Sequence, residues 1–505
     1  MEPLLVGLDA GTSSVKAVLL DLRGNLCASG SAEYPLHHLR TGWVEQEPED
    51  WWQATGKALR EALAKVEHGP ERVLGLAVSS QAPTLLPLDS SGRPLRPAII
   101  WMDRRAEAEA VHLTEVLGAE EIHRITGNRP DAFYLAARLL WLRNHELEIL
   151  KRTWKFAQVN GYLNYRLTGR LTVDPAHAVL MQMRNYATGE WSEALCSACG
   201  IDPAQFPEVM ESHHIQGQVT AEAAEATGLK AGTPVMAGTV DSPAAALEAG
   251  VAEPGIAVEM TGTSTVVIIP NDRGLTEPAL IALPHALPGI HLLLGAMVSS
   301  GGSLRWFQDQ FEKLSESDSR TESFDGLSRQ AAGIEPGSRG VIFLPYMMGE
   351  RSPIWNTNAR GVFFGLSLAT PKAALVRAIM EGAAFALRHN VETAQRAGAE
   401  VREMRSAGGC SRSDLWNQIK SDVLGMPLLL PRAAAGSPFG AAILAGMGAG
   451  VFPDIRKSLS EMVHLDRRFD PNPANHEKYT QIYRLYRNIY DHLKSDFDQA
   501  AKITP

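Results

Sequence analysis

The 505-residue sequence has only four cysteines, at Cys27, Cys196, Cys199 and Cys410. This number is too small for a disulfide framework in a chain of this length. Cys196 and Cys199 form a lone CxxC with no second pair, so a structural zinc site is not supported. A redox pair stays open beside the simpler interpretation of two thiols on one helix. The sequence also contains no run of about 18 apolar residues, which excludes a membrane-spanning helix of ordinary length.

Basic residues are in deficit. Lys and Arg number 48 against 57 Asp and Glu, a formal net charge of −9. Such a chain has no overall electrostatic reason to bind nucleic acid or an anionic membrane surface. Glu2 and Asp9 stand where a signal peptide would need positive charge, so we expect a cytoplasmic protein. Small anionic ligands remain open, because backbone N–H groups and single basic residues bind them locally.

Several familiar chemical motifs are missing. No GxxxxGK[ST] is present, and "GMGAG" at 446–450 lacks the GxGxxG spacing and follows a helical pattern instead of opening one. HExxH and GxSxG are absent as well. A Walker-type nucleotide site, a dinucleotide fold, a zinc protease and an α/β-hydrolase are therefore unsupported.

The sequence has the ordinary composition of a globular protein, with 45% apolar and 21% charged residues. Short apolar, β-branched runs alternate with helical patterns, which predicts the α/β class. The turn "DAGTSS" joins two such runs into a β-hairpin. The segments that we assign from pattern are strands at 3–9, 15–21 and 72–80 and helices at 49–67, 103–117 and 131–145.

An internal repeat divides the chain. Residues 7–20 read "GLDAGTSSVKAVLL" and residues 258–270 read "VEMTGTSTVVIIP", so that Gly11 and Gly262 lie 251 positions apart. Both copies predict a hairpin whose turn offers backbone N–H groups and hydroxyls. The spacing is about half of the chain, which favours two similar lobes. We place the boundary in "LEAGVAEPG", giving domains 1–248 and 249–505.

The first turn is a candidate phosphate site. A Gly-containing turn lets the backbone approach a phosphate while its N–H groups converge on it. Asp9 precedes the turn and is a candidate Mg²⁺ ligand, held through water, and Lys16 is a candidate phosphate contact. An ordinary hairpin turn with a solvated lysine explains the same residues, and this motif alone does not decide between them.

Two further motifs have two interpretations each. Asp241 precedes "SPAAALEA", so it is either a helix N-cap or a general base. Gly408 and Gly409 precede a helical pattern. They either let a flat ring lie against the backbone or form a tight strand-to-helix turn.

The order of several longer strings carries a family resemblance. The strings are "GLDAGTSSVKAVLLD", "GWVEQEPEDWW", "PLRPAIIWMDRRA", "YRLTG", "AGTVDSPAAALEAG", "EMTGTS", "SSGGSLRWF", "PYMMGERSPIWNTNARGVFFGLSL", "RAIMEGAAFALR" and "AGGCSRSDLWNQIKSDVLGMP". In this order, from Leu4 to about Gly450, the chain resembles the FGGY family of carbohydrate kinases. The resemblance implies two actin-like (ribonuclease H-like) α/β lobes with a central cleft, in which ATP and a sugar meet.

The resemblance also implies the reaction and its residues. ATP, with Mg²⁺ near Asp9, would phosphorylate a hydroxyl of an open-chain sugar, most simply a ketopentose such as xylulose, with Asp241 as general base. The nucleotide would contact Gly11, Thr12, Ser13, Ser14, Lys16, Gly262, Thr263, Gly301, Arg305, Gly408, Gly409 and Ser413. The sugar would contact Gln81, Ala82, Pro83, Asp103, Arg105, Phe133 and Asp241.

Departures from the family pattern leave the sugar open. Ala82-Pro83 stands where relatives have a pair that hydrogen-bonds sugar hydroxyls, and Phe133 stands where glycerol kinases have Tyr. Arg138 replaces a common Lys, and Ala374 a common His. Gluconate, glycerol, another polyol or a deoxysugar therefore remain alternative substrates. An actin-like ATPase without a sugar and a sugar-binding protein without catalysis remain alternative classes, and a homodimer is compatible with the sequence.

Overall fold

Both repeated segments fold as the antiparallel hairpins that the sequence predicts. In the computed structural model, β1 (Leu4–Ala10) pairs with β2 (Ser14–Leu20), and Asp9 lies opposite Lys16. Likewise β15 (Gly255–Thr261) pairs with β16 (Thr265–Asn271). In each copy the first strand also pairs in parallel with a third strand, β6 (Val73–Ser80) or β21 (Val401–Ala407). The repeat seen in the sequence is therefore a repeat of topology.

The structure describes residues 2–311, 320–432 and 436–503. The chain forms two units that interrupt one another in sequence. Unit 1 contains Met1–Ala252, Ala282–Leu292 and Ala433–His464. Unit 2 contains Glu253–Ile281, Leu293–Arg432 and Leu465–Pro505. Each unit is built around a large sheet.

The large sheet of unit 1 has the order β12-β13-β6-β1-β2-β3, with β14 beside β6. Its remaining strands are β3 (Leu26–Glu33), β12 (Ile215–Gln218), β13 (Pro234–Met236) and β14 (Thr239–Val240). β1 and β6 are central and almost wholly buried, which explains their continuous apolar sequence. The sheet therefore carries the carboxyl ends of β1, β6 and β14 side by side.

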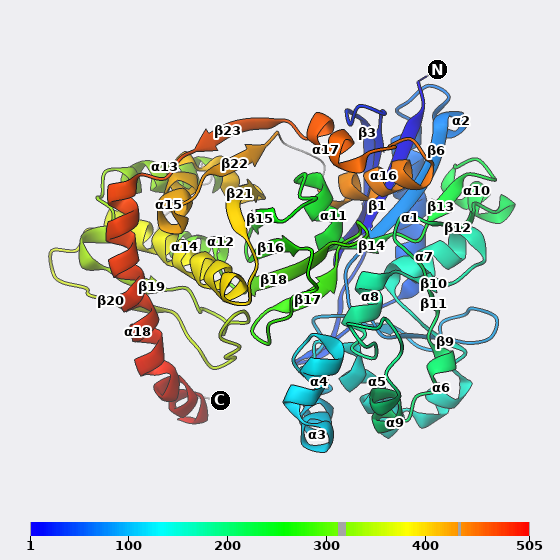
Figure 1. The fold of residues 1–505 in the computed structure, drawn as a ribbon, viewed down its shortest axis with the longest axis horizontal. Helices are drawn as coiled ribbons and strands as arrows, with labels where there is room; N and C mark the ends of the chain where they lie inside the picture. Colours follow the sequence, from blue (N-terminus) through cyan, green and yellow to red (C-terminus); the bar gives the residue numbers. More distant parts are fainter. Residues whose placement is uncertain (1, 312–319, 433–435, 504–505) are drawn as a thin grey trace. The chain divides into compact units, whose positions relative to one another are not determined.

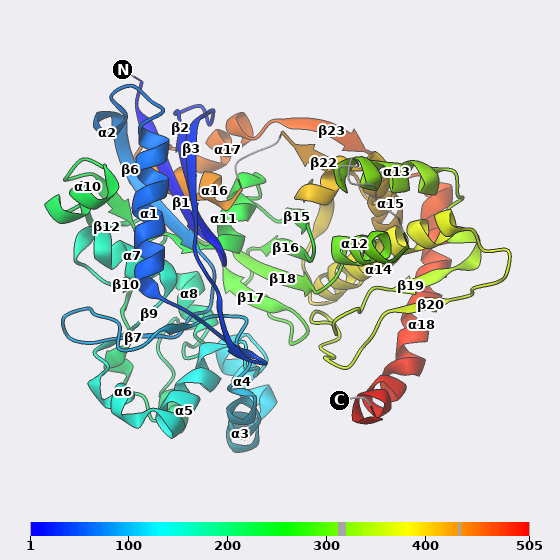
Figure 2. The same cartoon turned by 180° about the vertical axis from the view of Figure 1, so that it is seen from behind.

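Two helices pack on the two faces of this sheet. α1 (Pro48–Leu63) packs against β2 and β3, whereas α16 (Ser437–Gly448) packs against β1 and β6 (Figures 1 and 2). Gly7 lets α16 approach closely, since a Cβ there would lie 1.8 Å from the carbonyl oxygen of Pro438. This close packing fixes the strand that carries Asp9.

Smaller elements complete unit 1. The strands are β4 (His37–Arg40), β5 (Trp43–Gln46), β7 (Leu86–Leu88), β8 (Ala98–Ile99), β9 (Lys155–Ala157), β10 (Thr172–Val173) and β11 (Glu208–Val209). The helices are α2 (Gly69–Arg72), α3 (Glu107–Leu117), α4 (Ala119–Thr126), α5 (Leu135–His145), α6 (Leu147–Arg152), α7 (Val159–Thr168), α8 (Pro175–Leu180), α9 (Glu193–Cys199), the 3₁₀ turn η1 (Pro203–Gln205), α10 (Ala221–Thr227), α11 (Asp241–Glu248) and α17 (Ile455–Met462).

The predicted helices are present with shorter bounds. α1 ends at Leu63, before the predicted residue 67, because the N–H groups of Lys65 and Val66 make tighter bonds to the carbonyls three residues back. α3 and α5 each begin four residues later than the pattern predicts. Cys196 and Cys199 lie buried on α9 as free thiols, which confirms the simpler interpretation of the CxxC.

The second large sheet has the order β17-β18-β16-β15-β21-β22-β23. Its remaining strands are β17 (Ile281–Pro284), β18 (His291–Met297), β22 (Leu428–Pro431) and β23 (Leu465–Phe469), and a separate pair is formed by β19 (Ile342–Leu344) and β20 (Val362–Phe364). The helices of unit 2 are α12 (Gly301–Phe311), α13 (Arg320–Ala332), η2 (Ser338–Gly340), α14 (Lys372–Arg396), η3 (Gly409–Arg412), α15 (Asp414–Leu424) and α18 (Pro473–Ile503). The α/β class is thus as predicted.

None of the helices in the described ranges combines the length and apolar character of a bilayer-spanning segment.

Candidate active site

The turn after β1 is held rigidly by side chains from unit 1. The N–H of Gly11 donates to the carbonyl of Ser14 at 3.0 Å, which closes the turn. The Tyr34 hydroxyl donates to the carbonyl of Gly11, and Gln46 Nε2 donates to that of Thr12 at 2.8 Å. Because these carbonyls already have donors, the turn keeps one fixed shape. The turn that the sequence marks as a candidate phosphate site is therefore a preformed one.

Asp9 lies at the end of β1, partly exposed and beside like charges. Its Oδ1 accepts a hydrogen bond from Ser79 Oγ at 2.8 Å. Burial, followed by the charge of Asp241, raises the pKa of Asp9 to about 7, against the lowering effects of Ser79 and Lys16. A nearby cation would favour the ionised form. The chemistry of this carboxylate therefore fits a position next to a metal–phosphate group.

Asp241 is the first residue of α11 and is partly exposed. The N-cap position belongs to Val240, and no side chain caps this helix end. The capping interpretation of Asp241 is therefore wrong, because the helix begins one residue earlier than an Asp241 cap requires. Burial raises the pKa of Asp241 to about 6, although the Ser242 N–H and the charge of His177 lower it. A carboxylate with a raised pKa accepts a proton more readily than an ordinary one.

Glu248 is a third carboxylate that interacts with Asp9, beside Asp241. It was missed in the sequence, because "LEAG" indicates only a helix end. It is the last residue of α11, and its Oε1 accepts the N–H of Gly436 at 2.7 Å. Burial raises the pKa of Glu248 to about 7, while Lys16 lowers it. Its charge also contributes to the raised pKa of Asp9.

The residues expected to contact the sugar follow β6. Gln81 and Pro83 are buried, whereas Ala82 is partly exposed. The carbonyl of Pro83 accepts a hydrogen bond from Arg138 Nη1 at 3.1 Å. Phe133 is partly exposed. The exposed side chains here, Ala82 and Phe133, are apolar.

Asp103 and Arg105 bind each other. Arg105 Nη2 lies 2.8 Å from Asp103 Oδ2, and Arg105 Nη1 lies 2.7 Å from Glu45 Oε1. The N–H of Val44 also donates to Asp103 Oδ2, at 2.6 Å. The Arg105 side chain is only 1% exposed and that of Asp103 is 0% exposed. In this structure the polar groups of the pair are therefore bound to each other and to β5.

Unit 2 contains a cavity of about 380 Å³, within the range of small-ligand pockets. It is lined by Gly262, Thr263, Gly301, Leu304, Arg305, Phe324, Asp325, Ser328, Gly409, Cys410, Arg412, Ser413 and Trp416. Six of the residues expected from the resemblance line it, and Gly408 lies next to Gly409. The α13 residues were missed because no motif marks them. Leu304, Cys410, Arg412 and Trp416 were also missed, although they lie within strings that carry the resemblance.

The wall of this cavity is built from the second turn. The N–H of Gly301 donates to the carbonyl of Gly262 at 3.1 Å, and that of Gly302 donates to Thr263 at 2.9 Å. A Cβ on Gly301 would lie 2.3 Å from the carbonyl oxygen of Gly262, so the start of α12 can touch the turn only with glycine there. Gly408 has a φ of +86° and turns the chain from β21 into η3. These features keep one side of the cavity lined by backbone.

Within the described ranges, no group of three or more His, Cys, Asp and Glu side chains is arranged to hold a metal ion.

Comparison with known proteins finds matches over nearly the whole chain. Residues 4–248 match the N-terminal domain of the FGGY family of carbohydrate kinases, and residues 257–449 match its C-terminal domain. The chain is 31% identical over 500 residues to the xylulose kinase of Bacillus subtilis, covering 99% of this chain and 98% of the relative. It is 28% identical over 511 residues to the gluconokinase of the same organism, covering 99% and 98%.

The solved structure of xylulose kinase from Rhodospirillum rubrum superimposes with a TM-score of 0.92 at 30% identity, covering 98% of this chain and all of that one. The fold is thus the two-lobed actin-like architecture that the resemblance implied, and the enzyme is a sugar kinase that uses ATP. The chain belongs to the FGGY family of carbohydrate kinases.

Proposed function

We propose that this kinase transfers the γ-phosphoryl group of ATP to a hydroxyl of an open-chain ketopentose, with D-xylulose as the first substrate to test. The observation that carries the proposal is Asp241, a partly exposed carboxylate with a pKa raised to about 6 at the start of α11. Similarity to proteins named xylulose kinase over nearly the whole chain supports the sugar class.

Asp241 acts on the attacking hydroxyl. Phosphoryl transfer demands little covalent chemistry from the protein, so positioning and charge dominate. The carboxylate accepts a hydrogen bond from the hydroxyl, orients it, and takes its proton as the new P–O bond forms. General-base assistance of this kind contributes about 10²–10⁴-fold to the rate.

Asp9 serves the metal. When bound, Mg²⁺ would neutralise phosphate charge and orient the transferred group. One or two carboxylates, water and phosphates make up the usual Mg²⁺ environment, and Asp9 fits such a role through water. Burial and Asp241 raise the pKa of Asp9 to about 7, so its ionised form gains from a cation.

The nucleotide belongs to the cavity of unit 2. The adenine lies against Gly408 and Gly409, with Arg305 and Ser413 beside it, and the phosphates extend toward Gly262 and Thr263. Backbone-lined walls and a volume of about 380 Å³ support this placement. In unit 1, the turn of Gly11, Thr12, Ser13 and Ser14, together with Lys16, offers donors to the transferred phosphoryl group.

The sugar side offers few free polar groups. Ala82, Pro83 and Phe133 are apolar, and Asp103 and Arg105 bind each other. Gln81 is buried and its Nε2 donates to Gln46 Oε1 at 2.7 Å, which leaves Asp241 and the Oε1 of Gln81 as the main polar contacts. Rejection of an analogue requires buried polar groups that it leaves unpaired. We therefore expect either a broad ketose kinase or a preference for a sugar with an apolar edge, such as a deoxyketose.

A coupled ADP-release assay tests the proposal on D-xylulose, D-ribulose, a deoxyketose, gluconate and glycerol. We expect the ketoses to be turned over, and phosphate on the sugar to be found by mass spectrometry of the product. Sharp selectivity for gluconate or glycerol, with inert ketopentoses, would refute the substrate class. Gluconate is the main alternative, because a gluconokinase is among the full-length relatives.

We also propose a cytoplasmic homodimer. The four free thiols agree with a reducing compartment.

For the dimer, the structure offers an exposed apolar segment on and after β20, which pairs with β19 in a two-stranded sheet; its exposed residues are Phe364, Leu366 and Leu368. An exposed apolar edge of this kind suits a second copy of the chain. Sedimentation of Leu366→Lys against the unaltered protein tests it, and a monomer in both samples would refute it.

A further inference from the structure

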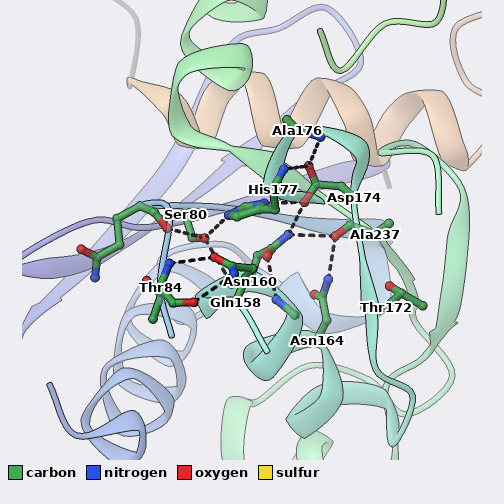
Figure 3. Close-up of polar contacts among 12 residues, drawn as sticks. Ser80, Thr84, Gln158, Asn160, Asn164, Thr172, Asp174, Ala176, His177 and Ala237 are labelled. Atoms are coloured by element: carbon green, nitrogen blue, oxygen red, sulfur yellow. Dashed lines mark hydrogen bonds and ion pairs between the residues drawn. The ribbon is translucent and has the colours of Figure 1, made fainter. Parts of the chain in front are cut away.

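Unit 1 contains a buried polar network behind the proposed active site. Ser80 at the end of β6, Asp174 just before α8 and His177 in its first turn are all 0% exposed. Figure 3 shows their side chains pointing toward one another. His177 Nε2 lies 3.1 Å from Ser80 Oγ, and His177 Nδ1 pairs with Asp174 Oδ2. None of these residues is assigned a role by the resemblance.

The network is complete at its acidic end. Asp174 Oδ1 accepts the N–H groups of Ala176 and His177, each at 3.1 Å, and Oδ2 accepts Asn160 Nδ2 at 3.1 Å (Figure 3). Buried ionic groups often stabilise less than apolar groups of the same volume. A satisfied network in a core therefore fits a requirement for one particular geometry better than a requirement for stability.

The network contacts the segment 237–240, which leads to Asp241, at two points. Val240, the neighbour of Asp241, lies opposite Ser80 in the parallel pairing of β14 with β6. Upstream, the carbonyl of Ala237 accepts Asn160 Nδ2 at 3.2 Å and Asn164 Nδ2 at 2.8 Å. Asn160 thus joins Asp174 to the start of this segment, while Ser80 joins His177 to its end (Figure 3).

Helix α7, which carries Asn160 and Asn164, also holds the segment that should face the sugar. Gln158, the residue before α7, accepts the N–H of Thr84 and donates to its carbonyl, both at 2.9 Å (Figure 3). Thr84 follows Ala82-Pro83, and Ser80 precedes Gln81. The network and Gln158 therefore hold both ends of the segment that should face the sugar.

A Ser–His–Asp chain also invites a hydrolytic interpretation. In hydrolases the serine must reach a substrate carbonyl. Here Ser80 is fully buried, and its Oγ also contacts the carbonyl of Gln81 and the N–H of Asn160, each at 3.2 Å. The Ser80–His177–Asp174 series therefore holds the backbone around Ser80 in place and does not present a nucleophile.

We propose that His177 is a positioning residue: with Asp174 and Ser80 it fixes the carboxyl ends of β6 and β14, and thereby the Asp241 carboxylate relative to the sugar hydroxyl. This inference rests on the proposed role of Asp241 as proton acceptor. The charge of His177 also lowers the pKa of Asp241, against the larger effect of burial, which is a second, electrostatic link between the two residues.

Two variants break the network at different points. His177→Gln keeps a polar group near Ser80 but loses the pairing with Asp174, and Ser80→Ala is a milder change that removes the link to β6. Displacing a catalytic group by about 1 Å can lower a rate about 10²-fold. We expect kcat to fall about 10- to 100-fold in His177→Gln and less in Ser80→Ala, with the KM for ATP unchanged.

Thr172→Val is the matched control, because it removes a buried hydrogen bond, from Thr172 to Gln216, that is not part of the network. It should lower the melting temperature but keep kcat. In an Asp241→Asn background, His177→Gln should add little further loss, because residues acting as a unit are non-additive. Turnover of D-xylulose and of the other sugars, with melting temperatures, supplies all readouts.

The outcomes separate the two proposals. Full activity of Asp241→Asn would refute the proposed function, as would absence of turnover on every sugar by the unaltered protein, and the inference would fall with it. An inactive Asp241→Asn beside a normal kcat in His177→Gln and Ser80→Ala would overturn the inference alone. The inference would also be overturned if His177→Gln lowered kcat no more than Thr172→Val does, or if its loss of kcat were additive with that of Asp241→Asn.

Discussion

Asp9→Asn should make the ligand-free protein more stable, and the gain should grow with pH. Burial and the charge of Asp241 raise the pKa of Asp9 from 3.8 to about 7. Below about pH 4 the side chain is protonated in both the folded and unfolded states. Between about pH 4 and 7 the unfolded chain has lost this proton while the folded one keeps it, so the stability of the unaltered protein falls as pH rises. Asn has no such proton.

The size of the effect follows from the shift. Each pKa unit corresponds to about 1.4 kcal/mol, so the whole shift corresponds to on the order of 4 kcal/mol, of which about 3 kcal/mol develops between pH 5 and pH 8. This is an upper bound, because Asp9 is partly exposed and water screens part of the charge. Asn keeps an oxygen that can accept the hydrogen bond from Ser79 Oγ.

Hydrogen exchange of the β1 amides is the assay, since it reports on unit 1 without assuming that both units unfold together. The comparison is made at pH 5 and pH 8 without nucleotide or Mg²⁺. Asp89→Asn is the control. Its carboxylate has a pKa lowered to about 2, chiefly by Ser91, so it is ionised in both states over this range, and its effect should not change with pH. If the change in stability caused by Asp9→Asn were also the same at pH 5 and pH 8, Asp9 would be ionised in the folded protein and the reasoning would be refuted.

Three further predictions concern catalysis, nucleotide binding and the core of unit 2. Asp241→Asn should lower kcat at least about 100-fold without lowering the melting temperature, because no capping bond is lost and burial already disfavours the charge at this position; a parallel loss of stability would contradict this. Gly409→Val should raise the KM for ATP about tenfold or more and leave stability intact, since a Cβ at Gly409 meets no atom within 4 Å and only narrows the cavity; an unchanged KM would place the adenine elsewhere. Lys420→Met should destabilise unit 2 by about 3–5 kcal/mol in urea unfolding, because it leaves the buried Glu259 without its charged partner at 2.5 Å; a smaller loss than in an exposed lysine variant would refute it.

Local sequence predicted the parts of this molecule that depend on neighbours in the chain. The hairpins around Gly11 and Gly262 follow from apolar runs and Gly-containing turns, and the structure confirms both. Helix ends were predicted less well, because the end of α1 depends on tighter bonds before Gly69. Glu248 was missed for a different reason: its importance comes from Gly436, which lies far away in sequence. His177 was missed likewise, because its partner Ser80 lies 97 residues earlier.

The two hairpins have the same backbone topology but differ in the residues around it, and this difference indicates different roles. In the first copy Asp9 stands before the turn, partly exposed and with its pKa raised, as suits a cation and phosphate. In the second copy Met260 takes the matching position. The neighbouring Glu259 is fully buried and is bound by Lys420 and Ser406. That carboxylate also accepts a hydrogen bond from Thr261 Oγ1 at the start of the turn, and Gly262 and Thr263 line the cavity. The duplicated hairpin thus places a carboxylate before the turn in unit 1 and an apolar residue there in unit 2, which agrees with the proposal that the first turn serves the metal and the second offers its backbone to the phosphates.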